Sequence, residues 1–344
     1  MSNSTLLIDA NSIGFAAQAT TRLTANGMET QSAFGFIRTM LAIRKTYPRY
    51  TPMVLWDGKA DWRYKLHPDY KSNRNADAEK VRNREAYKAM RPYIAKMLNT
   101  LGVRQLTGLK HEADDLGGLF ARKLSAAPGS KVGLITGDGD WVQLVRGATA
   151  TSGEVWWRDM RDDSRFIDSK NFYAKTGCLT PFAYLETKIL TGDTSDVISG
   201  VGGIGDKGAP EFIAEFGSVR EFWRRCDSGE YVPKLKAHQR LWKGTSPFTK
   251  EEWVAQQVLT AEVRTEKEEA KLKKQWVDAW PGQGRSIYKR NFQLMQLLKV
   301  EPPEKADVRL DTGKFDKDAF ANICEELNFI SLLRNMNEFV SYFQ

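Results

Sequence analysis

The sequence predicts an α/β protein with a mainly parallel central sheet flanked by helices, followed by a helical C-terminal part. In the first half of its 344 residues, short apolar runs alternate with stretches of helical periodicity, which is typical of parallel strands joined by helices. Three of these runs lead into an aspartate, at Asp9, Asp57 and Asp138. Because ligands of open α/β sheets bind at the carboxyl ends of the strands, we expect these aspartates to face one crevice.

The strands expected in the first half are the apolar runs at 5–10, 53–58, 132–136 and 155–157. The intervals carry the spacing of amphipathic helices, over roughly 34–47, 90–101 and 112–124. Residues 59–82 are polar, basic and aromatic with weak periodicity, which indicates an exposed loop that passes into a helix.

The apolar pattern becomes helical from about residue 180, so we expect two domains, at 1–180 and 181–344. The run GVGGIGDKGAP at 200–210 lies between two helix candidates and is too rich in glycine for anything but a tight turn. Residues 246–280 predict a charged helix pair, opened by a capping-box spacing from Thr249 to Glu252. Residues 318–343 predict a last amphipathic helix or pair.

The composition favours a polyanionic partner and a reducing compartment. The formal net charge is +8 and the isoelectric point is near 9.2, which does not separate DNA from RNA. Cys178, Cys226 and Cys324 lie far apart, which excludes a zinc ribbon. The N-terminus lacks the basic region of a signal peptide and no apolar run reaches the length of a membrane span. We therefore expect a cytoplasmic protein with no membrane partner.

Acidic residues recur at the ends of short apolar runs in this basic chain. Clustered carboxylates repel one another, so a fold that gathers them needs bound cations. A set of hard oxygen ligands without histidine indicates Mg²⁺ or Mn²⁺ rather than zinc. The alternative, a loop or helix-cap role, holds well for any single residue and less well for the set. The candidate metal ligands are Asp9, Asp57, Glu112, Asp114, Asp115, Asp138, Asp140, Asp193 and Asp196.

Two further motifs suit a nucleic acid. In WRYKLHPDYKSNR, at 62–74, cations that could meet phosphates are interleaved with aromatic rings on which bases could stack, although a solvated basic face would read the same way. The glycines of 200–210 would let backbone N–H groups approach phosphates at a helix N-terminus, as in a helix–hairpin–helix turn; the alternative is a plain connection. The three histidines share no metal-ligand spacing, and we expect them on the surface or in loops: His67, His111 and His238.

Taken in order, YKSNR, a glycine followed by EADD, LITGDGDWVQLV and GDTSDVISGVGGIGDKGA resemble the 5′ nuclease family over roughly residues 5–217. This family includes the 5′→3′ exonuclease domain of bacterial DNA polymerase I, phage flap endonucleases and phage ribonuclease H. The chain departs from the family pattern at Trp62, where phenylalanine is usual, at Lys110–His111, and at Val197–Ser199, where Asn-Ile-Pro is usual. Residues 218–344 match no family motif.

The resemblance implies a PIN-like 5′ nuclease fold with a basic arch near 60–105, a helix–hairpin–helix turn near 198–212 and an atypical C-terminal extension. It assigns the nine acids to two Mg²⁺ ions, for which Mn²⁺ could substitute, and Lys71 and Arg74 to the scissile phosphate. A K⁺ ion is often held at the turn in this family. The nucleic-acid-binding residues that the resemblance and the basic segment indicate are Arg63, Lys65, Tyr70, Gly202, Gly203, Gly205 and Lys207.

The implied activity is structure-specific cleavage of branched, nicked or RNA-primed DNA, which leaves a 5′-phosphate and a 3′-hydroxyl. Alternatives are a DNA-junction binding protein on a degenerate nuclease fold, or an enzyme restricted to ribonuclease H-type activity. Because no polymerase domain follows, we expect a monomeric, stand-alone nuclease of phage DNA replication and primer removal.

The partners expected beyond DNA are a sliding clamp or a single-strand binding protein. Met336, Phe339, Tyr342 and Phe343 have the spacing of a clamp-binding peptide, but the usual glutamine is absent. The same residues fit an apolar helix stripe, so we expect a terminal core helix instead.

Overall fold

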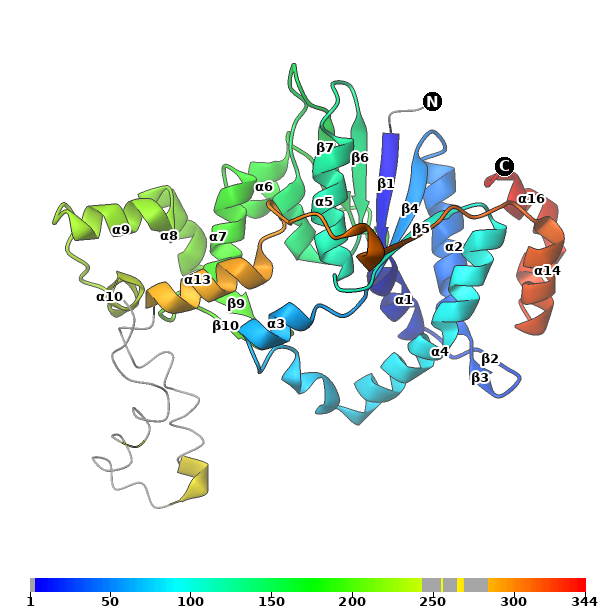
Figure 1. The fold of residues 1–344 in the computed structure, drawn as a ribbon, viewed down its shortest axis with the longest axis horizontal. Helices are drawn as coiled ribbons and strands as arrows, with labels where there is room; N and C mark the ends of the chain where they lie inside the picture. The colour runs from blue at the N-terminus through cyan, green and yellow to red at the C-terminus, as the bar shows by residue number, and fades with distance from the viewer. Residues whose placement is uncertain (1–3, 243–254, 256–264, 269–283) are drawn as a thin grey trace. The chain divides into compact units, whose positions relative to one another are not determined.

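The computed structural model describes residues 4–242, 255, 265–268 and 284–344 (Figure 1). They form two compact units. The α/β unit comprises Met1–Trp62, Arg74–Lys175 and Leu297–Gln344, and the helical unit comprises Arg63–Asn73 and Thr176–Gln296. The expected charged helix pair at 246–280 lies outside the described residues, apart from 255 and 265–268.

The α/β unit is built on a seven-stranded sheet in the order β11-β5-β4-β1-β6-β7-β8. The five central strands are parallel, and the two edge strands, β11 and β8, are antiparallel to their neighbours. The predicted mainly parallel sheet is therefore confirmed. The strands are β1 (Ser4–Asp9), β4 (Thr51–Trp56), β5 (Arg104–Gly108), β6 (Lys131–Ile135), β7 (Glu154–Arg158), β8 (Phe166–Ile167) and β11 (Val308–Asp311).

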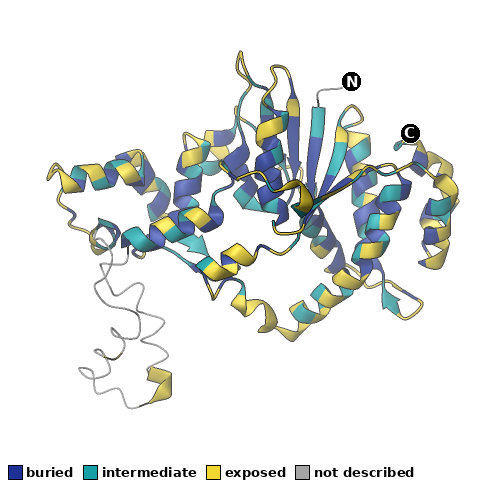
Figure 2. Ribbon diagram, viewed as in Figure 1, coloured by how far each residue is buried: buried dark blue, intermediate teal, exposed yellow. Residues whose placement is uncertain are grey.

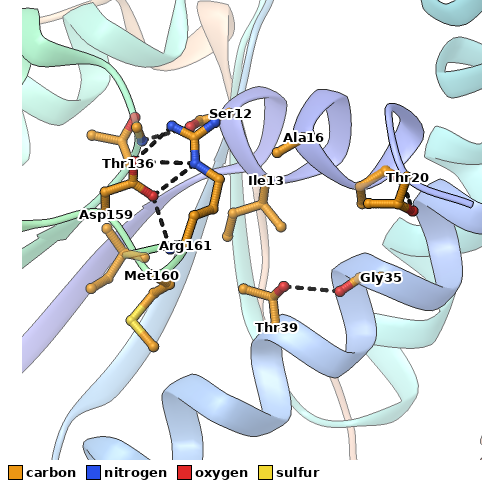
Figure 3. Close-up of a pocket in the computed structure, with 13 residues that line it drawn as sticks. Ser12, Ile13, Ala16, Thr20, Gly35, Thr39, Thr136, Asp159, Met160 and Arg161 are labelled. Atoms are coloured by element: carbon orange, nitrogen blue, oxygen red, sulfur yellow. Dashed lines mark hydrogen bonds and ion pairs between the residues drawn. The ribbon is translucent and has the colours of Figure 1, made fainter. Parts of the chain in front are cut away.

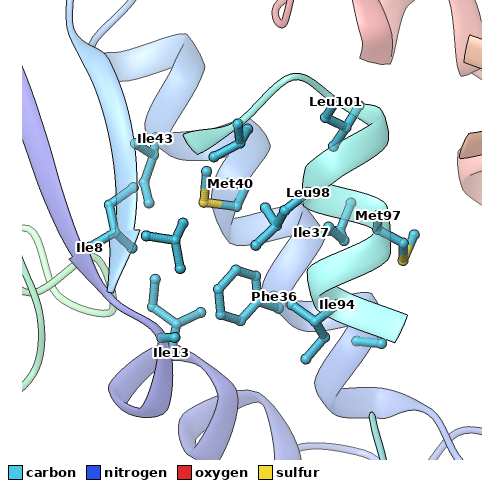
Figure 4. Packing of buried hydrophobic residues seen from close by; sticks show 14 of the residues in the cluster. Ile8, Ile13, Phe36, Ile37, Met40, Ile43, Ile94, Met97, Leu98 and Leu101 are labelled. Atoms are coloured by element: carbon cyan, nitrogen blue, oxygen red, sulfur yellow. The ribbon is translucent and has the colours of Figure 1, made fainter. Parts of the chain in front are cut away.

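Apolar side chains on both faces of β1 place this strand at the centre of the unit. Leu6 and Ile8 are fully buried and belong to the same core cluster as Phe36 and Ile94 (Figure 4). Leu7 is also fully buried and alternates to the other face, and α5 contacts β1, β4 and β6. The helices of this unit that flank the sheet are α1 (Ala10–Gln18), α2 (Gln31–Thr46), α4 (Ala78–Thr100) and α5 (Ala113–Leu124).

The segment 297–344 returns to the α/β unit and completes it. Strand β11 pairs with β5, and α14 packs against α4. Phe320 and Phe339 stack at 5.4 Å between ring centroids inside the core cluster. Met336 and Phe339 are only 8% and 3% exposed, which agrees with the expected core role of these residues. The helices of this segment are η4 (Lys305–Asp307), α14 (Lys317–Glu326), α15 (Ile330–Arg334) and α16 (Met336–Ser341), so three short α-helices replace the expected helix or pair.

The described residues of the helical unit form five main helices and the two-stranded hairpin β9–β10. Its apolar centre includes a cluster of aromatic rings from Phe212, Phe216, Phe222 and His238. His238 is 8% exposed and lies within α10, so the expectation of a surface or loop position is wrong for it. His67 lies in the loop after α3, as expected, although it is only 9% exposed. The elements are α7 (Pro181–Thr191), β9 (Gly192–Asp193), β10 (Ile198–Ser199), α8 (Gly208–Phe216), α9 (Val219–Asp227), α10 (Lys236–Trp242) and α13 (Gly284–Met295).

The remaining elements are short or lie where the two units meet in sequence: β2 (Thr24–Ala25), β3 (Met28–Glu29), α3 (Asp61–Leu66), η1 (Ser72–Asn75), η2 (Gly139–Leu144) and α6 (Phe172–Thr176). None of residues 74–86, which run from η1 into α4, is buried, and Figure 2 shows this stretch in yellow and teal. The next residues along α4 include Tyr87 and Met90, which are buried. Among the described residues, no helix combines the length and the apolar character needed to cross a bilayer.

Candidate active site

The strand-end aspartates of the α/β unit lie at one edge of its sheet. Asp9 ends β1, Asp57 directly follows β4, and Asp138 is the third residue after β6. These three strands are neighbours, with β1 in the middle, and all are parallel. Their carboxyl ends therefore carry three acidic side chains side by side.

Hydrogen bonds fix the orientation of the central carboxylate. Asp9 caps α1, since its Oδ1 accepts from the backbone N–H of Asn11 at 3.0 Å and of Ser12 at 3.1 Å. Its Oδ2 accepts from Thr136 Oγ1 at 2.8 Å. The side chain of Asn11 also donates to Asp57 Oδ2. The cap and the site thus use the same side chain, and the helix-cap alternative is true of Asp9 without excluding a ligand role.

The N-terminus of α5 adds three acids with different tasks. Asp57 Oδ1 accepts from Ala113 N at 2.6 Å, which ties this helix end to the strand ends. Asp115 Oδ2 accepts from Glu112 N at 3.0 Å, as in a capping box. Asp114 Oδ1 accepts from Trp141 Nε1 at 2.7 Å. Asp115 therefore stabilises the helix start, while Asp114 faces the loop after β6.

The loop after β6 is supported by Ser12 and Arg161, two residues that the sequence did not single out. Asp138 Oδ1 accepts from Asp140 N at 2.7 Å and so caps η2. Figure 3 shows the side chain of Arg161 beside Ser12 and Thr136, along a hollow of about 240 Å³ between α1, α2 and the end of β6. The backbone N–H of Gly137 donates to Ser12 Oγ at 2.7 Å, and a Cβ at Gly137 would lie 1.9 Å from Arg161 Nη2. This glycine lets the guanidinium pack directly on the loop.

An ion pair with Asp159 fixes the position of Arg161. Its Nε donates to Asp159 Oδ1 at 2.9 Å and its Nη2 to Oδ2 at 2.7 Å, and Asp159 also pairs with Arg165 at 2.5 Å. The only sequence signal for Asp159, Arg161 and Arg165 is their position, in DMRDDSR, directly after the predicted strand at 155–157.

Burial and mutual repulsion disfavour the charged forms of these carboxylates. Burial, followed by the charge of Asp57, raises the pKa of Asp9 from 3.8 to about 6, against the opposing hydrogen bonds. The pKa of Asp114 is raised well above its usual range, first by burial and then by the charges of Asp138, Asp9, Asp57 and Glu112. These five acids therefore lie within electrostatic reach of one another.

The donor set fits a hard divalent cation, because it consists of carboxylate oxygens whose repulsion a cation would relieve. Within the described part of the chain, however, no three His, Cys, Asp or Glu side chains converge on one point as they would around a bound ion. The oxygens that belong together chemically would have to move closer to share an ion.

The other two candidate acids, Asp193 and Asp196, belong to the helical unit and lie on the β9–β10 hairpin and its turn. Asp193 Oδ1 accepts from Ser195 N and Ser195 Oγ, both at 2.7 Å. Lys71 Nζ lies 3.6 Å from Asp196 Oδ2, and the backbone N–H of Lys71 donates to Asp196 O at 3.0 Å. One predicted phosphate contact is therefore held by one predicted metal ligand.

The segment 67–73 docks on this turn through two further contacts that the sequence did not predict. His67 Nε2 lies 2.9 Å from Val197 O, and Asn73 Nδ2 donates to Thr194 O at 3.2 Å. Lys71 and Val197 both adopt the left-handed backbone conformation, with φ of 59° and 60°. This conformation is costly for a β-branched residue, and the family's usual asparagine at position 197 would adopt it more readily.

Two residues of the basic segment have packing roles in place of the direct nucleic-acid contacts expected of them. Arg63 is 2% exposed and its Nε donates to Leu294 O at 3.4 Å. Tyr70 is 4% exposed, packs on Tyr64 at 5.4 Å between ring centroids, and lies 4.6 Å below Lys71 Nζ. A buried ring cannot stack on a base. Lys65 and Arg74 are exposed.

The glycine turn of the helical unit lies between β10 and α8. Gly202 and Gly203 have φ of 67° and 79°, a conformation that explains the need for glycine at both positions. Gly203, Gly205 and Lys207 are exposed, and α8 begins directly after Lys207.

Residues 4–177 match the model of the 5′-3′ exonuclease N-terminal resolvase-like domain. The chain belongs to this 5′-3′ exonuclease family. The family resemblance read from the motifs is thereby confirmed. DNA polymerase I of Lactococcus lactis subsp. lactis is 30% identical over 233 residues, which are 65% of this chain and 25% of that protein. Thermostable DNA polymerase I of Thermus filiformis is 29% identical over 224 residues, with 64% and 25% covered. The chain thus matches about a quarter of the length of these relatives.

Several solved structures share the fold at low sequence identity. The 5′-exonuclease of T5 with bound zinc has a TM-score of 0.58 at 19% identity, with 99% of this chain and 100% of that chain covered. The bacteriophage T5 flap endonuclease in a complex with DNA and metal ions has a TM-score of 0.55 at 20% identity, with 94% and 99% covered. The catalytic core of Rad2 with a DNA substrate has a TM-score of 0.51 at 14% identity, with 100% and 93% covered. The predicted 5′ nuclease fold is confirmed.

Proposed function

We propose that this member of the exonuclease family is a structure-specific 5′ nuclease that hydrolyses phosphodiester bonds in branched, nicked or RNA-primed DNA. The observation that carries the proposal is the group of carboxylates at the ends of β1, β4 and β6, of which Asp9 is buried and Asp57 and Asp138 are half-buried, and which disfavour one another's charged forms. Such a group is costly in a protein without bound cations, whereas a metal-dependent phosphodiesterase uses one to hold its ions. The T5 structure with DNA and metal ions and the Rad2 structure with a DNA substrate support the same activity by analogy.

The first ion would be held by Asp9, Asp57, Asp114 and Asp138, and Glu112 and Asp140 lie close in sequence to complete its shell. Asp193 and Asp196 would serve a second ion. Bound Mg²⁺, with Mn²⁺ as a substitute, would supply Lewis-acid charge and lower the pKa of an attacking water. A K⁺ ion at the glycine turn, near Gly203 and Gly205, belongs to the same proposal.

The side chains of the protein supply the remaining chemistry. Thr136 and Asn11 orient the carboxylates of Asp9 and Asp57. Lys71, held over the ring of Tyr70, provides a fixed positive charge that stabilises the negative charge of the phosphate in the transition state. Arg74 is exposed on η1 and would reach a phosphate from solvent. The products would carry a 5′-phosphate and a 3′-hydroxyl.

Residues 74–86 are the exposed part of the proposed basic arch, through which a single strand would pass. The segment contains four cations, Arg74, Lys80, Arg82 and Arg84, and Lys88 follows two residues beyond it. The absence of buried residues over 74–86 leaves one strand of a flap free to contact both sides of the segment.

The decisive experiment measures cleavage of 5′-labelled flap, nicked and RNA–DNA substrates with Mg²⁺ and with EDTA. Asp138→Asn should abolish cleavage and leave DNA binding intact or tighter, because one negative charge is lost. Asp318→Asn, a change of an exposed acid on α14, is the matched control and should cleave normally. Normal turnover by Asp138→Asn would refute the site. Binding without turnover in the wild type would instead favour a junction-binding protein, and cleavage of RNA–DNA alone would favour a ribonuclease H.

A further inference from the structure

Helix α10 packs directly on the glycine turn of the helical unit. A Cβ at Gly202 would lie 2.8 Å from Ala237 O and 3.3 Å from Arg240 Cβ, so only glycine allows this approach. At Gly203, the same position lies 3.6 Å from Arg240 Nη1. Gly203 is exposed and Arg240 is half-buried, so part of the arginine remains open to solvent beside the turn.

The charge of this segment has one sign. Residues 231–242 read YVPKLKAHQRLW, which contains Lys234, Lys236 and Arg240 and no acid. Lys236 and Arg240 are four residues apart and therefore share the face of α10 that meets the turn. Lys234 and Lys236 are exposed, as is Lys207 on the other side of the turn. Among the described residues, no carboxylate forms an ion pair with any of these four cations.

The position of α10 is fixed by contacts on its opposite face. Leu241 is fully buried, and its carbonyl accepts from Trp223 Nε1 at 2.9 Å. The ring of His238 packs edge-on against Phe212 at 5.2 Å between centroids. A Cβ at Gly284 would lie 1.9 Å from Arg240 O, so α13 also touches this helix closely. The cations are thus held in place relative to the turn before any ligand arrives.

We propose that α10 and the turn at 202–205 form a single surface that binds the phosphate backbone of duplex DNA, with Arg240, Lys236 and Lys207 as its cations. This inference rests on the proposed function for the presence of a DNA substrate, and it assigns a role to residues that match no family motif. Arg240 suits the central position, because a guanidinium can bind a phosphate through two hydrogen bonds while backbone N–H groups of the turn bind the next. Lys236, one helical turn away, meets a further phosphate along the same strand.

The test is the salt dependence of binding to a nicked DNA duplex in EDTA, where cleavage does not occur, measured by fluorescence anisotropy. Each neutralised phosphate contributes about 0.9 to the slope of log affinity against log salt concentration. One such contact therefore changes the affinity roughly fourfold between 1 M and 0.2 M salt. Lys236→Gln and Arg240→Gln should each lower the slope by about one unit, and the double variant by about two. Arg334→Gln, a change of an exposed arginine on α15, is the matched control and should bind as the wild type does.

An unchanged slope in a double variant that melts normally would overturn the proposal. If Arg240→Gln melts early, the Lys236→Gln slope decides, because that exposed side chain has no packing role to lose. Failure of the nuclease proposal is a separate outcome: the wild-type protein would bind DNA in Mg²⁺ without cleaving it. In that case, lower salt slopes of the Lys236→Gln and Arg240→Gln variants would still support the DNA-binding surface.

Discussion

Replacing Asp9 by asparagine removes one charge from the centre of the carboxylate group and keeps the size of the side chain. In metal-free protein the pKa of Asp9 is raised from 3.8 to about 6, so the folded state holds this proton more tightly than the unfolded chain. The stability that this provides is fully present below about pH 4 and is lost as the pH rises through 6. The shift of about two pH units corresponds to roughly 3 kcal/mol. As the pH rises from about 4 to 8, the unfolding free energy of Asp9→Asn should therefore increase by roughly 3 kcal/mol relative to that of the wild type.

Urea unfolding followed by tryptophan fluorescence, in EDTA from about pH 4 to pH 8, measures this difference. Added Mg²⁺ at pH 8 should raise the midpoint of the wild type more than that of Asp9→Asn, because a cation relieves repulsion that the variant lacks. Asp318→Asn should run parallel to the wild type throughout. A gap between Asp9→Asn and the wild type that stays constant with pH would refute the idea that burial and the charge of Asp57 raise the pKa of Asp9.

Three other changes test separate parts of the structure. Val197→Asn should raise the unfolding free energy by about 1 kcal/mol, because asparagine tolerates the left-handed backbone that valine holds at φ 60°; a lower melting temperature would contradict this. Phe339→Ala should cost about 3–5 kcal/mol in thermal or chemical unfolding, since the ring is 3% exposed in the core, whereas an unchanged stability would revive the clamp-peptide alternative. Lys71→Ala should lower the single-turnover rate by about 10²-fold with unchanged duplex affinity. A loss of affinity alone would show that Lys71 serves DNA binding and not the chemical step.

The sequence predicted the sheet and its acidic edge because both leave strong local signals. Buried parallel strands appear as short apolar runs, and each run that matters here leads into an aspartate. Asp9 shows that a helix-cap role and a metal-ligand role can be combined in one residue, because one carboxylate oxygen caps the helix while the other faces the site.

The parts that the sequence missed depend on contacts between distant segments. Strand β11 is four residues long, lies at an edge, and pairs with residues about 200 positions earlier, so its pattern is too short to be informative. Arg63 and Tyr70 sit in a run that is basic and aromatic overall, and only the packing of the helical unit distinguishes them from their exposed neighbours. Neither Ser12 nor Arg161 belongs to a motif, because support of a loop demands no fixed sequence.

The return of residues 308–344 to the first unit has a consequence for synthesis on the ribosome. Asn26 Nδ2 donates to Glu326 O across 300 residues, and Arg44 Nε donates to Tyr342 O across 298. While the helical unit is being translated, the outer edge of β5 and the apolar face of α4 are already made but have no cover. An open strand edge and an apolar helix face are the surfaces on which nascent chains aggregate, so this protein depends on its last forty or so residues, or on a chaperone until they emerge, to leave the ribosome soluble.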